Sequence, residues 1–320
     1  MRIDSVLGSR ELAQFAADVR VSLTRDPRQI PSQYLYDGLG SALFEAICHL
    51  PWYGVTRAEH RLLARDAGKV LTGDCRLLVE LGPGNGSKMA SLLSNVCPDG
   101  RPLTIHLVDV STAALRQATR TLERFRGVSV LQHVAHYEAG LEAFSAARLE
   151  GRAVALLLGS NIGNFAADEA RAFLRRVRAA LRPGDGLLLG TDLVKPERQL
   201  IEAYDDPLGV TAAFNRNLLV RLRDGLGANI DLDAFAHRAI WNREHARVEM
   251  HLVSLRFQRI VIPAADLTFT MAEGETIWTE SSHKYEPEGV RSTLEDCGLS
   301  VSAQWIDEAD RFALTYAIVR

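Results

Sequence analysis

The most constraining feature of this sequence is the junction between an apolar run and a glycine-rich turn at residues 77–93. Leu77-Leu78-Val79 predicts a buried strand that ends at Glu80, and from Lys88 onward the apolar spacing becomes helical. Glycines stand at alternate positions in between, at 82, 84 and 86. Glycine at a strand-to-helix turn lets a ligand lie against bare backbone, and the new helix offers unpaired N–H groups. The junction therefore predicts a site for a nucleotide-like cofactor.

The spacing of the glycines narrows the cofactor class. The dinucleotide fingerprint is G-x-G-x-x-G with an acid about 20 residues on. Here the third glycine, Gly86, comes one residue early and Glu80 precedes the turn, so a nicotinamide dehydrogenase is disfavoured. The pattern resembles motif I of S-adenosylmethionine methyltransferases. The ammonium and sulfonium of S-adenosylmethionine suit the acid Glu80, and Asp109, at the end of the next predicted strand, is suited to the ribose hydroxyls.

Strand and helix patterns alternate along most of the chain from residue 76. Helices at 113–125 and 168–181 separate predicted strands, and helices of this length between strands imply right-handed crossovers and a parallel sheet. We expect an α/β, Rossmann-like class I methyltransferase fold, closed by an antiparallel pair of strands after a helix at 287–297, with the last strand inserted antiparallel. The predicted strands are 77–81, 103–109, 128–133, 153–158, 186–191, 300–306 and 312–319.

This rhythm breaks near residue 196. Residues 197–245 are predicted to be mostly helical, and residues 248–262 alternate as one long strand before Pro263. We expect an inserted, smaller substrate lobe, with the active site in the crevice outside the carboxyl ends of the strands. The predicted division is a cofactor domain of residues 56–195 and 283–320 and a substrate lobe of residues 1–55 and 196–282.

The N-terminal segment is predicted to be an amphipathic helical lead-in over residues 1–30, followed by a helix at 42–49. Aromatic residues in the turns on either side of that second helix favour packing contacts when taken alone. A further helix is expected to begin after Thr56, with Thr56 as N-cap and Glu59 as its capping-box partner.

Composition excludes several classes of function. The net charge of −3 and the pI of about 6.3 give no reason to expect nucleic acid or an anionic membrane as a partner. No apolar run approaches the roughly 18–20 residues of a membrane span, and the N-terminus lacks a signal-peptide core. Four separated cysteines without a C-x-x-C pattern favour thiols in a reducing compartment, and nine histidines without ligand spacing argue against a metal site. We expect a cytoplasmic monomer that acts on a small molecule.

Several stretches together resemble one family, the histidine-specific S-adenosylmethionine methyltransferases of ergothioneine biosynthesis. The similarity covers essentially the whole chain and is far more specific than the glycine turn. The matching stretches are YLYDGLGS at 34–41, LPWY at 50–53, LGSNIGNF at 158–165, GTDLVK at 190–195, AYDD at 203–206, GVTAAFNRN at 209–217, EM at 249–250 and TESSHKY at 279–285.

The resemblance implies a reaction and a set of site residues. The enzyme would methylate the α-amine of L-histidine three times and give the betaine hercynine. Tyr53, Asn164 and Tyr204 would hold the amine and carboxylate of the substrate, with Tyr36 near the reacting nitrogen, so that Tyr36 and Tyr53 are the candidate catalytic residues. Glu280 and Ser282 would bind the imidazole and Met250 would line its pocket. The implied cofactor residues are Gly82, Lys88 and Asp109, with His136 and Tyr137 at the adenine position; Glu80, Gly84 and Gly86 join them from the turn itself.

The chemistry of these residue types agrees with the implied roles. A carboxylate and a hydroxyl suit an imidazole, which offers an N–H and a basic nitrogen, and Glu280 and Ser282 share one face of an alternating strand. Simpler interpretations remain open: Glu280 as a solvated strand acid, Ser282 as a turn hydroxyl and Asn164 as a cap. Met250 fits a core position better than a substrate contact, because methionine fills irregular gaps in a core.

Some positions depart from the family pattern. Gly54 and Val55 replace a tyrosine and a proline, Ser111 replaces an acid, and Ala135-His136-Tyr137 replaces a G-D-F stretch whose acid meets the adenine. The sequence therefore leaves the substrate open. The alternatives are another aromatic or modified histidine-like amino acid as substrate, or a non-catalytic S-adenosylmethionine-binding regulator.

Overall fold

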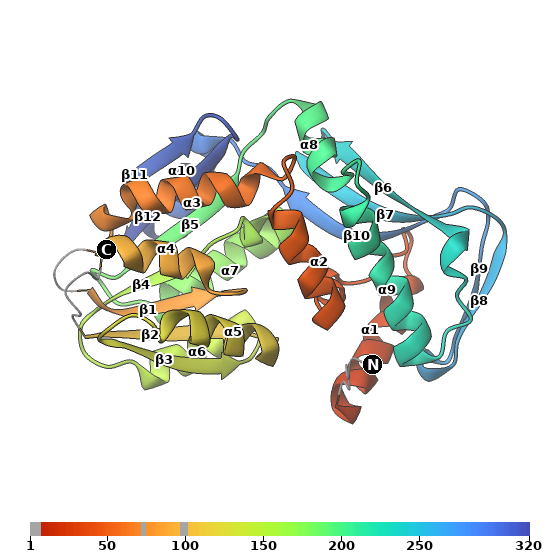
Figure 1. The fold of residues 1–320 in the computed structure, drawn as a ribbon, viewed down its shortest axis with the longest axis horizontal. Helices are drawn as coiled ribbons and strands as arrows, with labels where there is room; N and C mark the ends of the chain where they lie inside the picture. Colours follow the sequence, from red (N-terminus) through yellow and green to blue (C-terminus); the bar gives the residue numbers. More distant parts are fainter. Residues whose placement is uncertain (1–7, 72–74, 97–101) are drawn as a thin grey trace. The chain divides into compact units, whose positions relative to one another are not determined.

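A computed structural model describes residues 8–71, 75–96 and 102–320 (Figure 1). The chain divides into two compact units. The first, the sheet unit, consists of Gly54–Val194 and His283–Arg320, drawn in Figure 1 from orange to green and again in blue. The second, the insertion unit, consists of the chain up to Tyr53 and of Lys195–Ser282.

The sheet unit is built on a seven-stranded sheet with the order β11-β12-β5-β4-β1-β2-β3. Strands β1 to β5 pair with one another in parallel. Strand β12 lies between β5 and β11 and runs antiparallel to both. This topology confirms the predicted Rossmann-like class I methyltransferase fold, including the antiparallel insertion of the last strand. The strands are β1 Cys75–Leu81, β2 Leu103–Asp109, β3 Val128–Val134, β4 Arg152–Leu157, β5 Gly186–Asp192, β11 Leu299–Asp307 and β12 Phe312–Val319.

Helices connect and cover these strands. The α-helices are α3 Gly54–Asp66, α4 Ser87–Val96, α5 Thr112–Leu122, α6 Tyr137–Ala147, α7 Ala167–Ala180 and α10 Pro287–Asp296, and two 3-10 turns are η2 Ala67–Lys69 and η3 Asn161–Asn164. Apolar side chains of α6, α7 and α10 pack with alternate residues of the strands in one continuous core. Helices α3, α4 and α5 pack against one another in sequence.

The alternation of side chains along β1 decides where its last acid points. Leu77, Val79 and Leu81 belong to the core under α6, α7 and α10. Because successive strand residues face opposite sides, Leu78 and Glu80 point away from that core. Lys88 of α4 and Glu59 of α3 are the nearest charged influences on Glu80, which places its carboxyl group on the α3 and α4 side at the carboxyl end of the strand.

The described residues of the insertion unit form four α-helices and two small sheets. Its helices are α1 Ser9–Leu23, α2 Gly38–Cys48, α8 Glu197–Tyr204 and α9 Val210–Leu226, with the 3-10 turns η1 Ser32–Leu35, η4 Leu232–Ala234 and η5 Pro263–Ala265. Its strands are β6 Phe235–Asn242, β7 Arg247–Ser254, β8 Gln258–Ile262, β9 Leu267–Met271 and β10 Thr276–His283. They form a sheet of order β10-β7-β6 and a β8–β9 hairpin.

Two expectations about the insertion were wrong. The helical prediction for 197–245 fails after Gly227, whose positive φ of 69° ends α9, and residues 235–242 form β6 against β7. The single strand expected over 248–262 is two strands in different sheets. Leu255 and Phe257 lie exposed in the turn between these strands. The apolar alternation in the sequence therefore runs on through a turn, which made two strands look like one.

Two further observations concern membrane and thiol chemistry. No helix of the described residues is long and apolar enough to cross a membrane. Cys48, Cys75 and Cys297 form no disulfide among the described residues, and Cys97 lies outside them.

Candidate active site

The glycine-rich turn between β1 and α4 has the backbone that its sequence predicts. Gly82, Gly84 and Gly86 have φ values of 74°, 55° and 78°, a region that L side chains rarely adopt. A Cβ on Gly82 would lie 2.6 Å from the hydroxyl of Tyr137, and one on Gly86 would lie 2.9 Å from the Cα of Ala118. No atom lies within 4 Å of the same position on Gly84. The turn therefore packs closely at its two ends and leaves backbone accessible at its middle.

Glu80 is the most unusual group at this turn. Its side chain is 1% exposed, and neither carboxylate oxygen has a hydrogen-bond partner among the described residues. Burial raises the pKa of Glu80 to about 7, with Glu59 and Asp109 adding to the rise and Lys88 opposing it. An orphaned buried acid is costly, and a bound cation would supply its missing partner.

Asp109 ends β2 beside the turn. Its Oδ1 accepts a hydrogen bond of 2.8 Å from the backbone N–H of Ser111, and Ser111 itself caps α5. Burial raises the pKa of Asp109, while backbone hydrogen bonds from Ser111 and Val110 oppose that rise. A second partly buried acid thus stands at the carboxyl end of the neighbouring strand, as predicted for a ribose contact.

The two residues expected near the adenine occupy different environments. Tyr137 opens α6, packs against the core and interacts through its hydroxyl with Asn161, and burial raises the pKa of that hydroxyl above its usual range. His136 is the exposed residue just before α6 and its side chain makes no capping hydrogen bond. Tyr137 therefore borders the turn through Gly82, whereas His136 faces solvent.

Lys88 and Glu59 form an ion pair of 2.9 Å that the sequence did not predict. The capping-box expectation was wrong, because α3 begins at Gly54 and Thr56 lies inside it. The carboxylate of Glu59 is fully buried and also accepts the backbone N–H of Gly159. Lys88 thus lies at the start of α4 as expected, held by an acid from α3.

These residues fit S-adenosylmethionine. The orphaned carboxyl of Glu80 suits a cationic group, the middle of the glycine turn admits a ligand to bare backbone, and Asp109 suits a diol. The carboxyl end of a parallel sheet is also where such folds bind nucleotide ligands.

The predicted substrate tyrosines meet in an aromatic cluster of the insertion unit. Tyr36 packs edge-on against Phe44 and Phe214, with ring centroids 5.4 Å apart in each pair. Tyr53 packs edge-on against Phe44 and against Tyr204, at 6.2 Å in each pair. Sequence reasoning missed Phe44 and Phe214, since a phenylalanine in a helix reads as ordinary core. The structure therefore brings Tyr36, Tyr53 and Tyr204 together.

Glu280 and Ser282 join the same cluster through hydrogen bonds. Both lie on β10 and both are buried, at 8% and 5% exposure. The hydroxyl of Tyr36 donates to Oε1 of Glu280 over 3.4 Å, and the hydroxyl of Tyr204 donates to Oγ of Ser282 over 2.7 Å. Glu280 is thus not a solvated strand acid, and Ser282 lies in a strand, not in a turn.

Met250 lies on β7 and is 1% exposed. Its backbone carbonyl accepts from the hydroxyl of Thr279, which also contacts Oδ1 of the fully buried Asn215. Asn215 in turn contacts Nδ1 of His237, whose Nε2 lies 2.8 Å from the carbonyl of Tyr204. This chain of hydrogen bonds supports Tyr204 and β10 from behind. Asn215 and His237 carry no sequence pattern of their own that would have identified them.

Asn164 belongs to the sheet unit, not to the unit that holds the tyrosines. It ends η3 and is exposed. The loop before it is held by Ser160, which has a positive φ of 58° and whose Oγ accepts the backbone N–H of Asp192. Asn164 therefore follows the fourth strand as the sequence predicts, on a loop tied to β5.

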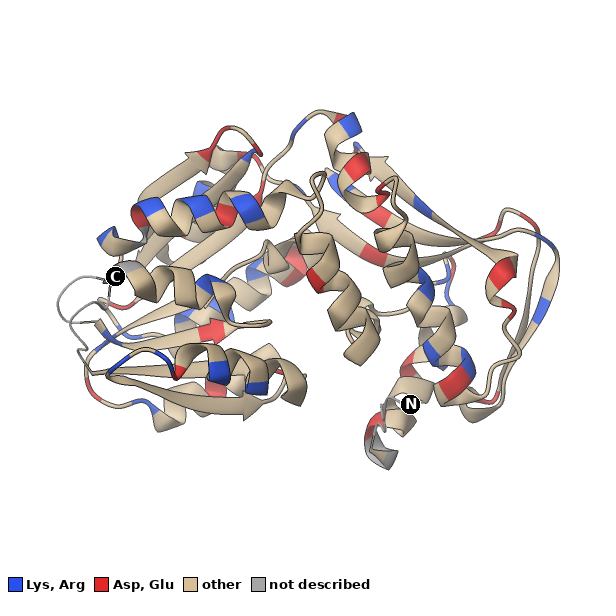
Figure 2. Cartoon of the chain, in the orientation of Figure 1, with Lys and Arg blue, Asp and Glu red and all other residues tan. Residues whose placement is uncertain are grey.

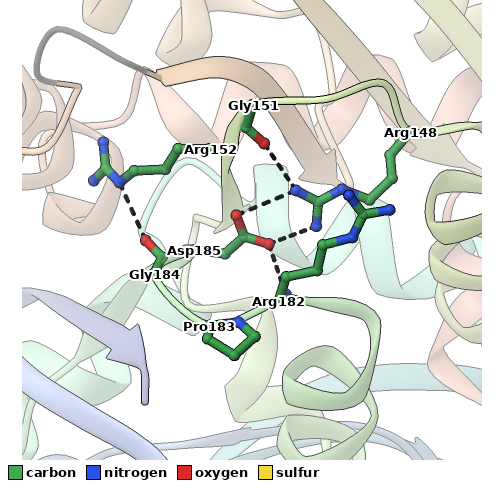
Figure 3. A pocket seen from close by; sticks show the side chains of 7 residues that line it. All are labelled: Arg148, Gly151, Arg152, Arg182, Pro183, Gly184 and Asp185. Atoms are coloured by element: carbon green, nitrogen blue, oxygen red, sulfur yellow. Dashed lines mark hydrogen bonds and ion pairs between the residues drawn. The ribbon is translucent and has the colours of Figure 1, made fainter.

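A separate pocket of about 220 Å³ lies at the opposite edge of the sheet (Figure 3). Its lining includes Arg152 and Asp185, at the starts of β4 and β5, whereas Glu80 stands at the carboxyl end of the parallel strand β1. In Figure 3 the carboxylate of Asp185 pairs with Arg148 and accepts the backbone N–H of Arg182. These contacts stabilise the amino ends of β4 and β5, and none of them involves a residue of the cofactor turn.

Charged residues of both signs are spread over the described part of the chain. Figure 2 shows acidic and basic residues interspersed on both units, without an extended run of one sign. Among the described residues no group of three or more histidine, cysteine or acidic side chains is arranged to hold a metal ion.

Comparison with known proteins adds an independent line of evidence. The chain matches the model of the histidine-specific, S-adenosylmethionine-dependent methyltransferases over residues 15–319. It is 39% identical to the histidine N-alpha-methyltransferase of Mycolicibacterium smegmatis over 94% of both chains. It is also 39% identical to that of Mycobacterium tuberculosis, over 94% of this chain and 93% of the relative. The ergothioneine biosynthesis protein 1 of Neurospora crassa is 26% identical over 87% of this chain and 32% of its own length. The chain belongs to the family of histidine-specific methyltransferases, and its cofactor is S-adenosylmethionine.

Proposed function

We propose that this enzyme methylates the α-amine of L-histidine and carries the reaction to the trimethylated betaine. The observation that carries the proposal is the pair of hydrogen bonds, from Tyr36 to Glu280 and from Tyr204 to Ser282, that reach two buried side chains of β10. The acid and the serine so held supply the acceptor and the donor that an imidazole needs. The similarity to two histidine N-alpha-methyltransferases supports the same reaction.

In this proposal Glu280 and Ser282 recognise the imidazole. The carboxylate of Glu280 accepts the ring N–H, and a serine hydroxyl can accept from Tyr204 and donate to the basic ring nitrogen at once. Met250 closes the pocket with an apolar, adaptable surface. The bound ring thus has a partner for each of its nitrogens.

The aromatic hydroxyls orient the other end of the substrate. Tyr53 and Tyr204, together with Asn164, hold the amine and the carboxylate, and Tyr36 stands near the reacting nitrogen. Neutral donors and acceptors orient a zwitterion without adding a charge that competes for the amine. Burial of the amine lowers its ammonium pKa and favours the unprotonated form that each methylation requires. When bound, S-adenosylmethionine supplies the electrophilic methyl group.

The two units divide the work. The sheet unit has almost the residue bounds expected for the cofactor domain, 56–195 and 283–320. It binds the cofactor with Glu80, Gly82, Gly84, Gly86, Lys88, Asp109, His136 and Tyr137. The insertion unit has almost the residue bounds expected for the substrate lobe, 1–55 and 196–282. It supplies most of the residues that bind the amino acid. We place this enzyme in the cytoplasm as a monomer; the buried thiols of Cys75 and Cys297 support a reducing compartment.

The experiment that tests this function is turnover of an amino-acid panel by the purified enzyme, with products identified by mass spectrometry. We expect L-histidine to be preferred over tryptophan, tyrosine and ring-methylated histidine, and to gain three methyl groups. A preference for another panel member would replace the substrate, and a product that stops at one or two methyl groups would revise the extent of methylation.

The variant Glu280→Ala tests the imidazole contact. We expect kcat/KM for histidine to fall by about 10- to 100-fold, because a hydrogen bond to a charged group is worth about 1.5–3 kcal/mol. Glu273→Ala, in an exposed turn of the same unit, is the matched control and should behave as wild type. Unchanged histidine turnover in Glu280→Ala would remove Glu280 from the site.

The departure from the family pattern at Gly54 has a local packing reason. A Cβ on Gly54 would lie 2.2 Å from a carboxylate oxygen of Asp310, in the turn between β11 and β12. A tyrosine at this position would need the side chain of Asp310 to move. The substitution therefore belongs to the packing of the sheet unit and gives no support to a different substrate.

A further inference from the structure

Glu59 is the one fully buried acid of α3 that lies beside the cofactor turn. Its side chain is 0% exposed, and its Oε2 lies 2.9 Å from the ammonium of Lys88, whose side chain is 22% exposed. Both of its carboxylate oxygens lie within 2.9 Å of the backbone nitrogen of Gly159. One carboxylate thus joins α3, the first turn of α4 and the loop that follows β4.

Two glycines make room for this arrangement. A Cβ on Gly159 would lie 2.5 Å from Nζ of Lys88, and a Cβ on Gly190 of β5 would lie 2.2 Å from Oε1 of Glu59. Gly159 also has a positive φ of 74°. The backbone around the carboxylate is therefore shaped to admit it, which an incidental surface ion pair would not require.

We propose that Glu59 is a positioning residue of the cofactor site, which holds Lys88 and the loop beginning at Gly159 in place for S-adenosylmethionine. The position of this loop matters for the cofactor turn, because two residues after Gly159 the loop reaches Asn161. The Nδ2 of Asn161 lies 2.7 Å from the place that a Cβ on Gly82 would occupy. Asn161 also interacts with the hydroxyl of Tyr137. Glu59 thus acts on the glycine turn from two sides without touching the cofactor.

The charge of Glu59 has a second consequence. It neutralises Lys88, so that the acids Glu80 and Asp109 leave the site attractive to a cation. Removal of this charge takes one negative charge away from beside the cofactor turn, which disfavours a cationic ligand. S-adenosylmethionine carries a sulfonium that its demethylated product, S-adenosylhomocysteine, lacks. The two ligands should therefore respond differently to the loss, which a defect of folding alone would not produce.

The test is calorimetric binding of S-adenosylmethionine and S-adenosylhomocysteine to Glu59→Gln and Glu59→Asp. We expect Glu59→Gln to lower the affinity for S-adenosylmethionine by about tenfold or more. The affinity for S-adenosylhomocysteine, whose sulfur is uncharged, should fall by clearly less. The pH midpoint of binding should also move down, because the charge of Glu59 raises the pKa of Glu80. Glu59→Asp keeps the charge and should keep the midpoint of the wild type, while it weakens both ligands through the shorter side chain.

The control is Asp66→Asn, which neutralises another buried acid of the same helix, paired with Arg65 and Lys69. It should change thermal stability without changing the ratio of the two affinities. Wild-type affinities and pH midpoint in a folded Glu59→Gln would overturn the proposal. So would an equal loss for both ligands that Asp66→Asn reproduces. If Glu59→Gln fails to fold, Glu59→Asp decides: wild-type affinity for both ligands would overturn the proposal. None of these readouts uses histidine, so the outcome is independent of the proposed substrate.

Discussion

Glu80 is a carboxyl group whose protonation should be coupled to cofactor binding. Burial holds its pKa at about 7 in the free enzyme, and its oxygens lack partners among the described residues. A cation bound beside it favours the ionised form and lowers that pKa. The free enzyme then carries more protons than the complex below about pH 7, so affinity should rise with pH up to that region and level off above it.

We expect the dissociation constant of S-adenosylhomocysteine, which has an ammonium group, to increase by up to about tenfold per pH unit below pH 7. Calorimetry in buffers of different ionisation enthalpy should detect the released proton. Glu80→Gln should bind more weakly and lose this pH dependence. An affinity that is constant from pH 6 to 8 in the wild type would contradict the coupling.

The residues of the site differ in how well the sequence could identify them. Gly82 and Asp109 were predicted because a backbone conformation and a strand end favour their residue types, and their cofactor roles stay predictions. Glu59 was misassigned because a threonine followed three positions later by a glutamate matches a helix start, while its true partners, Lys88 and Gly159, are 29 and 100 residues away in the chain. Local pattern cannot reveal a partner that only the tertiary fold supplies.

Strands β2 and β3 carry a pair of histidines, one buried and one half-buried, that makes the sheet unit sensitive to acid. Nδ1 of His106 lies 2.9 Å from Nε2 of His133, and His106 is 1% exposed against Phe144. Burial, reinforced by His133, lowers the pKa of His106 to about 4. The unfolded chain therefore binds more protons between about pH 6.5 and 4, and stability is full above that window and falls through it.

Because of this pair, the free energy of unfolding should fall by about 2–3 kcal/mol between pH 7 and pH 4. Urea unfolding at several pH values would measure this slope. We expect His106→Gln to be less stable at pH 7 but to lose less on acidification. His245→Gln, at an exposed turn, should keep the slope of the wild type. Equal slopes in all three proteins would show that the pair is not the source.

Elements were predictable where one physical signal dominated. The predicted limits of the five parallel strands agree with the structure to within a residue or two. Strands β1, β4 and β5 are almost wholly buried and mostly apolar, whereas the edge strand β3 has only half-buried and exposed side chains. Strand β6 was missed because its side chains are mostly half-buried, so its apolar pattern is weak. The break between β7 and β8 depends on Ser254, whose Oγ donates to the carbonyl of Arg256 and accepts from Gln258. Such a turn leaves no glycine or proline in the sequence to mark it.

The whole molecule consists of two compact units that divide after Tyr53, Val194 and Ser282, against expected boundaries after residues 55, 195 and 282. The boundaries follow from where the strand–helix rhythm stops and resumes, which the sequence records directly. The division of roles between the units is a proposal that ligand protection can test. A ligand that binds the native state opposes local opening of the elements it contacts.

Hydrogen exchange should therefore separate the two ligands by unit. We expect S-adenosylhomocysteine to protect β1, the glycine turn and β2, and histidine to protect β10 and the first turns of α9 in the insertion unit. In Glu280→Ala the histidine protection should disappear while that of the cofactor product remains, because Glu280 belongs to the insertion unit and the proposed cofactor residues belong to the sheet unit. Histidine protection confined to peptides of the sheet unit would contradict the assignment of the insertion unit to the substrate. Protection of both units by the cofactor product alone would contradict the independence of the two sites.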